Sequence, residues 1–136
     1  MAAAIEGTCL CGSIRIAVPR VPREVTQCNC SVCRSYGVLW AYYARPSVKI
    51  TAARGRIVAW SRRPRGRLQF LHCKSCGCII AWERRTRGKD ERMGVNARLF
   101  DHAAIADVSI EVLDGDKTWK TLERYTKPGI FISPKR

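Results

Sequence analysis

Short runs of alternating polar and apolar residues predict that this chain is built mainly from β-strands. Residues 13–18 (SIRIAV) show the pattern plainly, because polar and apolar side chains alternate as in a half-buried strand. Other short runs are rich in β-branched and aromatic residues and are bounded by Gly, Pro or Arg, which also favours strands. They occupy residues 38–43, 48–51, 57–60, 68–71, 78–83, 93–96 and 108–112.

Helical signal is weak. Residues 31–36 and 101–106 each predict one helical turn, the second of them behind Asp101 as an N-terminal cap. The chain contains no internal repeat and no low-complexity linker, and its 136 residues suit one domain. We therefore expect a single all-β domain over residues 1–136, with short strands arranged as a sandwich or a related stack of sheets.

The sequence predicts neither a membrane span nor a secretion signal. No apolar stretch approaches the roughly 20 residues that a spanning helix needs. The N-terminus lacks a basic n-region and a long apolar h-region. We therefore expect a cytoplasmic location and no membrane partner. In that reducing compartment, closely spaced cysteines are more often metal ligands or catalytic groups than disulfides.

Eight cysteines fall into three groups along the chain. The groups are Cys9 and Cys11; Cys28, Cys30 and Cys33; and Cys73, Cys76 and Cys78. Zinc is commonly held by four thiolates in a tetrahedron. The C-x-x-C-G segment from Cys73 is a good half-site, because its two thiolates converge and Gly77 permits a turn with positive φ. Its second pair comes either from the first group or from the second.

If Cys9 and Cys11 complete that site, the second group is left with three thiolates and one open coordination position. An incomplete set of protein ligands is typical of a catalytic zinc. In the alternative interpretation, Cys78 or a histidine completes this set and the site is structural. We expect instead that Cys78 is a small buried hydrophobe, that His72 points away from Cys73 and that His102 faces solvent.

Together the cysteine motifs resemble those of one family. They are C-x-C-G from Cys9, C-x-C-S-x-C-R from Cys28 and C-x-x-C-G from Cys73, and residues 95–101 (VNARLFD) are also similar. The chain resembles the glutathione-dependent formaldehyde-activating enzymes, the family of the centromere protein V domain, from Gly7 to about Asp107. The resemblance implies a β-tent fold of stacked short antiparallel sheets organised around zinc. Cys78 departs from the pattern, which more often has a small hydroxyl or apolar residue there.

The resemblance also implies the cofactors and the activity. It implies a structural zinc held by Cys9, Cys11, Cys73 and Cys76, and a second zinc held by Cys28, Cys30 and Cys33. The activity of the family is a carbon–sulfur lyase reaction, the formation or cleavage of S-(hydroxymethyl)glutathione, with glutathione as co-substrate and a small thiol or aldehyde as partner. An open zinc would favour the thiolate form of the attacking sulfur. We further expect Arg34 to hold a substrate carboxylate and Asn96 to donate a hydrogen bond near the site.

Charge supports an alternative function. The chain carries 25 Lys and Arg against 11 Asp and Glu, a formal net charge of +14, which predicts attraction to polyanions. Six arginines lie between Arg54 and Arg67, yet no aromatic RNA-binding motif or recognition helix accompanies them. The alternative is a zinc-stabilised basic module that binds nucleic acid or an acidic protein. A redox role of the exposed thiolates is a further alternative.

Overall fold

The strands form two sheets in the computed structural model, which describes residues 4–86 and 91–126. The three-stranded sheet has the order β1-β2-β5, with bounds Ile5–Thr8, Ile14–Val18 and Lys49–Ala52. The eight-stranded sheet has the order β11-β10-β3-β4-β9-β8-β7-β6. Its strands in chain order are β3 (Glu24–Cys28), β4 (Trp40–Ala44), β6 (Ile57–Trp60), β7 (Leu68–Cys73), β8 (Ile79–Arg84), β9 (Arg92–Asn96), β10 (Ser109–Leu113) and β11 (Thr121–Tyr125).

Helices are short and few in the described part of the chain. The α-helix α1 (Ser31–Tyr36) is accompanied by the 3₁₀ turns η1 (Arg45–Ser47), η2 (Ala97–Leu99) and η3 (His102–Ile105). Both predicted helical turns are therefore present, and Asp101 caps η3 by accepting a hydrogen bond from the Ala103 N–H. No described helix is long and apolar enough to cross a membrane. The all-β expectation is confirmed.

Alternation in the sequence becomes burial on one face of a strand. In β2 the side chains of Ile14, Ile16 and Val18 are buried in the main core, whereas Arg15 is exposed. The pattern does not predict β1, β3 or β11. The polar composition of β11 explains the miss, because nearly all of this strand is exposed and it lies at the edge of its sheet.

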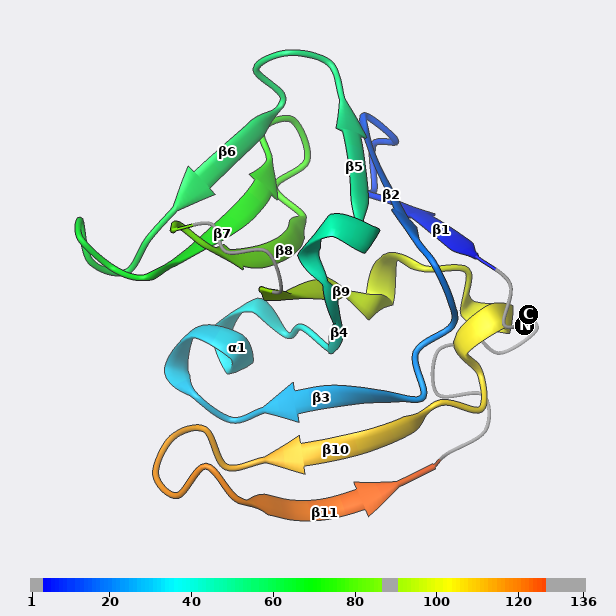
Figure 1. Cartoon of the computed structure of the whole chain (residues 1–136), viewed down its shortest axis with the longest axis vertical. Coiled ribbons are helices and arrows are strands. Elements are labelled where there is room, and N and C mark those ends of the chain that lie inside the picture. Colours follow the sequence, from blue (N-terminus) through cyan, green and yellow to red (C-terminus); the bar gives the residue numbers. More distant parts are fainter. Residues whose placement is uncertain (1–3, 87–90, 127–136) are drawn as a thin grey trace.

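One strand pair differs from the antiparallel arrangement that the resemblance implies. β10 pairs with β3 in parallel, and Leu113 lies opposite Cys28 at the end of the ladder. Parallel strands end at the same edge of a sheet. The loop that follows β10 is therefore placed beside the cysteines that follow β3 (Figure 1).

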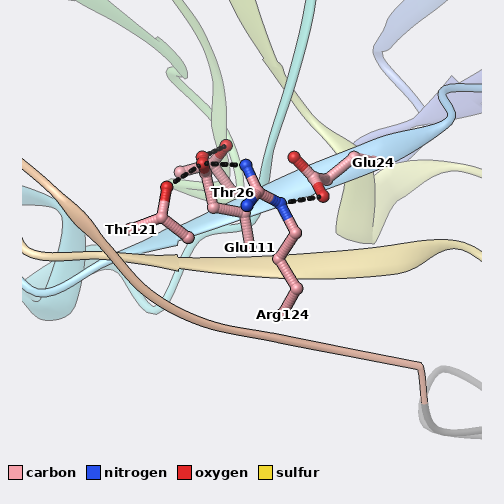
Figure 2. A network of polar contacts seen from close by, with 5 residues as sticks. All are labelled: Glu24, Thr26, Glu111, Thr121 and Arg124. Carbon is pink, nitrogen blue, oxygen red and sulfur yellow. Dashed lines mark hydrogen bonds and ion pairs between the residues drawn. The ribbon is translucent and has the colours of Figure 1, made fainter.

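A polar network ties β11 to the rest of the sheet (Figure 2). Glu111 on β10 accepts hydrogen bonds from Thr26 on β3 and from Thr121 on β11, at 3.1 and 2.6 Å. Arg124 on β11 reaches across β10 and pairs with both Glu111 and Glu24, at 3.2 and 3.0 Å. Exposed ion pairs are individually weak, but several charges joined in a network contribute more than isolated pairs.

Candidate metal centres

Two pairs of cysteines that lie far apart in the sequence come together in the structure. The sulfur atoms of Cys9, Cys11, Cys73 and Cys76 all lie within 4.8 Å of one another. The Cys11 sulfur lies 3.6 Å from the sulfurs of both Cys9 and Cys73. Four thiolates at about 2.3 Å from one zinc ion would be separated by about 3.8 Å. The donor set and its spacing therefore suit a tetrahedral metal ion.

Two similar turns present these thiolates. Gly12 and Gly77 each have φ of 77°, and their backbone N–H groups donate to the carbonyls of Cys9 and Cys73. Left-handed backbone is accessible to glycine at little cost, which explains the C-G pair in both motifs. Backbone N–H groups of Ile14 and Cys76 point at the sulfurs of Cys9 and Cys73, at 3.3 and 3.5 Å. Such donors stabilise thiolate charge.

Ser13, for which the sequence pattern predicts only a place in a strand, contacts this four-cysteine cluster. Ser13 Oγ lies 3.0 Å from the Cys11 sulfur and 3.3 Å from the Cys73 sulfur. The hydrogen bond from Ser13, helped by the Cys76 N–H, lowers the pKa of the Cys73 thiol to about 5. In the sequence, the signal for a role of Ser13 at this cluster is its position directly after the C-x-C-G motif.

The second group of cysteines forms a separate three-cysteine cluster at α1. Cys28 ends β3, Cys30 is the N-terminal cap of α1, and Cys33 lies in the helix. Their sulfurs lie within 4.8 Å of one another, and no fourth cysteine, histidine or carboxylate in the described ranges joins them at that separation. Three donors leave one position of a tetrahedral metal ion for an exchangeable fourth ligand.

Burial and hydrogen bonding act in opposite directions on these three thiols. Burial raises the pKa of Cys28 and of Cys33. Burial also disfavours the Cys30 thiolate, but hydrogen bonding from the Cys33 N–H and side chain outweighs it, so the pKa of Cys30 is lowered. Buried thiolates repel one another, and a bound cation removes that cost. The cluster is chemically suited to a metal ion.

Trp40 connects the three-cysteine cluster to the core. Its indole Nε1 donates to the Cys33 sulfur at 3.3 Å, while its ring is fully buried against Phe70. In the structure it is a core residue that also contacts a cluster sulfur.

The β10–β11 loop lies against this cluster, and the sequence motifs did not reveal it. Asn29 donates to Asp114 and accepts from the Asp116 N–H, both at 3.0 Å. A Cβ added at Gly115 would lie 2.3 Å from the Cys28 sulfur. Trp119 is 70% exposed and has φ of 59°, and its ring borders Gly115. In the sequence, the signal for this loop is the Asp114-Gly115 pair, but such a pair predicts only a turn.

Other candidates lie outside both clusters. Cys78 is partly buried against the main core and belongs to neither cluster, and burial raises the pKa of its thiol. His72 Nε2 lies 3.0 Å from the Tyr36 hydroxyl, and His72 too belongs to neither cluster. His102 is exposed, as expected.

Arg34, expected to hold a substrate carboxylate, and Asn96, expected to donate a hydrogen bond near the site, differ in their surroundings. Arg34 is exposed on α1, one residue after Cys33, and forms no ion pair with a carboxylate in the described part of the chain. Asn96 lies on β9 opposite Trp40. Its amide is buried and donates to the Ile79 carbonyl at 3.0 Å, and its oxygen accepts from the Arg98 N–H, so it caps η2.

A cavity of about 490 Å³ opens on the three-stranded sheet. Its lining includes Ser13, Arg15, Lys49 and Thr51. Ser13 places it next to the four-cysteine cluster, whereas none of its lining residues belongs to the three-cysteine cluster. The cavity is therefore separate from the three-cysteine cluster.

Comparison with known proteins agrees with this geometry. The sequence matches the family described as glutathione-dependent formaldehyde-activating enzyme over residues 4–114, a range that contains all eight cysteines. A crystal structure of a Rhodobacter sphaeroides protein is similar, with a TM-score of 0.59 and 25% identity, covering 69% of this chain and 85% of that one. No curated protein matches the chain. The chain therefore belongs to the glutathione-dependent formaldehyde-activating enzyme family.

Proposed function

We propose that the chain is a zinc-dependent carbon–sulfur lyase that acts at the three-cysteine cluster. In the proposed reaction, the sulfur of a thiol such as glutathione bonds to the carbonyl carbon of formaldehyde or a related aldehyde. The thiol proton ends on the carbonyl oxygen, so the product is a hydroxyalkyl thioether. The reverse reaction cleaves the same carbon–sulfur bond.

A single observation carries this proposal. Cys28, Cys30 and Cys33 converge to within 4.8 Å, and no fourth ligand atom in residues 4–86 and 91–126 joins them. The other cluster already supplies four thiolates. That difference favours a structural role for Cys9, Cys11, Cys73 and Cys76, and a reactive role for the three-cysteine cluster.

A zinc ion held by Cys28, Cys30 and Cys33 would lower the pKa of a thiol substrate and so supply the nucleophilic thiolate. Around it, the protein holds the ligands in place. The N–H groups of Cys30 and Cys33 point at the sulfurs of Cys28 and Cys30, at 3.5 and 3.4 Å. These donors, and the Trp40 indole, reduce the negative charge on three adjacent thiolates.

Substrate binding draws on the positive charge around α1. We propose that the exposed guanidinium of Arg34 contacts a carboxylate of the thiol substrate, because its helix position is next to Cys33. Arg62 also reaches α1, where its Nη1 donates to Ser31 Oγ at 2.7 Å. Both groups favour an anionic thiol such as glutathione over a neutral one.

The test compares Cys30→Ser with Cys78→Ser, a matched control because Cys78 belongs to neither cluster. Metal analysis should find about two zinc ions per chain in the wild type and in Cys78→Ser, and about one in Cys30→Ser. Circular dichroism should be unchanged in all three. Adduct formation from glutathione and ¹³C-formaldehyde, followed by NMR against the protein-free rate, should be accelerated by the wild type and by Cys78→Ser alone.

Turnover that survives Cys30→Ser would overturn the assignment of the reaction to this cluster. Zinc at about one per chain in every variant would overturn the assignment of a metal site there. Two bound zinc ions without any acceleration by the wild type would leave the metal sites standing and overturn the proposed substrate. An Arg34→Ala variant should raise KM for glutathione while leaving the response to 2-mercaptoethanol unchanged.

A further inference from the structure

A long stretch of the chain carries positive charge with no negative charge to balance it. Residues 46–82 contain no aspartate or glutamate. Their eight Lys and Arg side chains are all exposed, and within the described ranges none of them forms an ion pair. The eight are Lys49, Arg54, Arg56, Arg62, Arg63, Arg65, Arg67 and Lys74.

The nearest carboxylate along the chain is already engaged. Glu83 on β8 is buried and accepts hydrogen bonds from Arg45 and from Gln69. Beyond it, Arg84 and Arg85 add two further exposed cations, and Arg85 Nη1 donates to the Pro64 carbonyl at 2.6 Å. Four of the eight, Arg62, Arg63, Arg65 and Arg67, lie between β6 and β7, so positive charge is concentrated in the loop of this hairpin, whose strands are labelled in Figure 1. Repulsion among these positive charges destabilises the folded protein, and a bound polyanion would relieve it.

An exposed aromatic side chain lies on the same hairpin. β6 is an edge strand and every one of its residues is exposed. Trp60 at its end is 45% exposed and rests against buried Phe70, with ring centroids 6.0 Å apart. Packing on Phe70 fixes one side of the indole and leaves the rest open to solvent. An aromatic platform flanked by arginines is typical of surfaces that bind single-stranded nucleic acid.

We propose that the β6–β7 hairpin binds single-stranded nucleic acid, with arginines on the phosphates and a base stacked on Trp60. A single strand fits better than a duplex, because a stacking platform requires an unpaired base and the described chain offers no helix longer than six residues for a groove. It fits better than an acidic protein because carboxylates would leave the indole without a partner. This function goes beyond the lyase proposal and does not depend on it.

The test is fluorescence anisotropy with a labelled oligothymidine of about 15 nucleotides and with a duplex of equal length, over a series of salt concentrations. The single strand should bind more tightly. If four to six phosphates are contacted, the log–log salt dependence should have a slope of roughly −3 to −4. A duplex preference, or a flat salt dependence, would overturn the proposal.

Two matched pairs of variants separate stacking from charge. Trp60→Ala should weaken binding about tenfold, whereas Trp119→Ala, which removes an exposed tryptophan from another loop, should not. Arg63→Ala with Arg65→Ala should make the salt slope shallower by about 1.4, and Lys117→Ala with Lys120→Ala should leave it unchanged. Equal effects of the two members of either pair would overturn the assigned surface. Competition by poly-glutamate as strong as that by oligothymidine would identify an acidic protein as the partner and overturn the nucleic-acid assignment.

Discussion

The indole nitrogen of Trp40 donates a hydrogen bond to the sulfur of Cys33 at 3.3 Å. Trp40 belongs to β4 and is fully buried, whereas Cys33 belongs to α1. The contact thus joins the smaller apolar core, formed by Val38, Trp40, Phe70 and Ile79, directly to a thiolate of the three-cysteine cluster.

Replacing Trp40 by Phe removes this donor and keeps an aromatic ring in the core. Hydrogen bonds to metal-bound ligands typically change metal affinity by about 10–100-fold, so zinc affinity at the three-cysteine cluster should fall by at least about tenfold. Competition with a chromophoric chelator measures the effect. Trp60→Phe is the control, since Trp60 does not contact the cluster. Equal affinities of the two variants would mean that the Trp40 bond does not tune the site.

Gly115→Ala should disturb the three-cysteine cluster specifically. The added Cβ would lie 2.3 Å from the Cys28 sulfur, a separation at which the loop or the cysteine must move. Overpacking of this kind costs about 1–3 kcal/mol, which urea unfolding of the metal-free protein can measure. Adding Cys28→Ala removes the clashing sulfur, so Gly115→Ala should then cost much less. A cost unchanged by Cys28→Ala would place the strain elsewhere in the loop.

Asn29→Ala should raise the pKa of Asp114. Hydrogen bonds from the Asn29 amide and from Thr118 hold the pKa of this exposed carboxyl below its ordinary value. A lowered folded-state pKa stabilises the protein above the unfolded pKa, and that stabilisation is lost as pH falls through the folded value. NMR titration of the Asp114 carboxyl carbon measures the shift, with Asp107 as an internal reference. An Asp114 pKa that does not change in Asn29→Ala would contradict the assigned cause.

Cys11→Ser should destabilise the fold much more than Cys78→Ser. Cys11 is exposed, so the substitution leaves no core cavity, but it removes one of four thiolates that join segments 62 residues apart. A metal clip that closes so long a loop strongly constrains the unfolded chain. Thermal unfolding with and without a chelator measures the difference. If the chelator lowers the Tm of Cys11→Ser as much as that of the wild type, the four-cysteine cluster is not the stabilising site.

The spacing of the cysteines and the alternation of polar and apolar residues in the strands supported the strongest predictions from the sequence. The turns at Gly12 and Gly77 are local features, and their residues lie within a few positions of the thiolates they present. Local geometry of this kind follows from backbone sterics, which a sequence displays directly. The same is true of β2, whose alternating side chains specify one buried face.

Only the tertiary structure decided which distant residues surround the three-cysteine cluster. The parallel pairing of β10 with β3 brings Asp114 to Asn29 across 85 positions, and it places Gly115 against Cys28. A turn-forming Asp-Gly pair carries no information about which strand its neighbour will join. That choice depends on how the apolar faces of all the strands pack together, and it determines which loop lies against the cysteines.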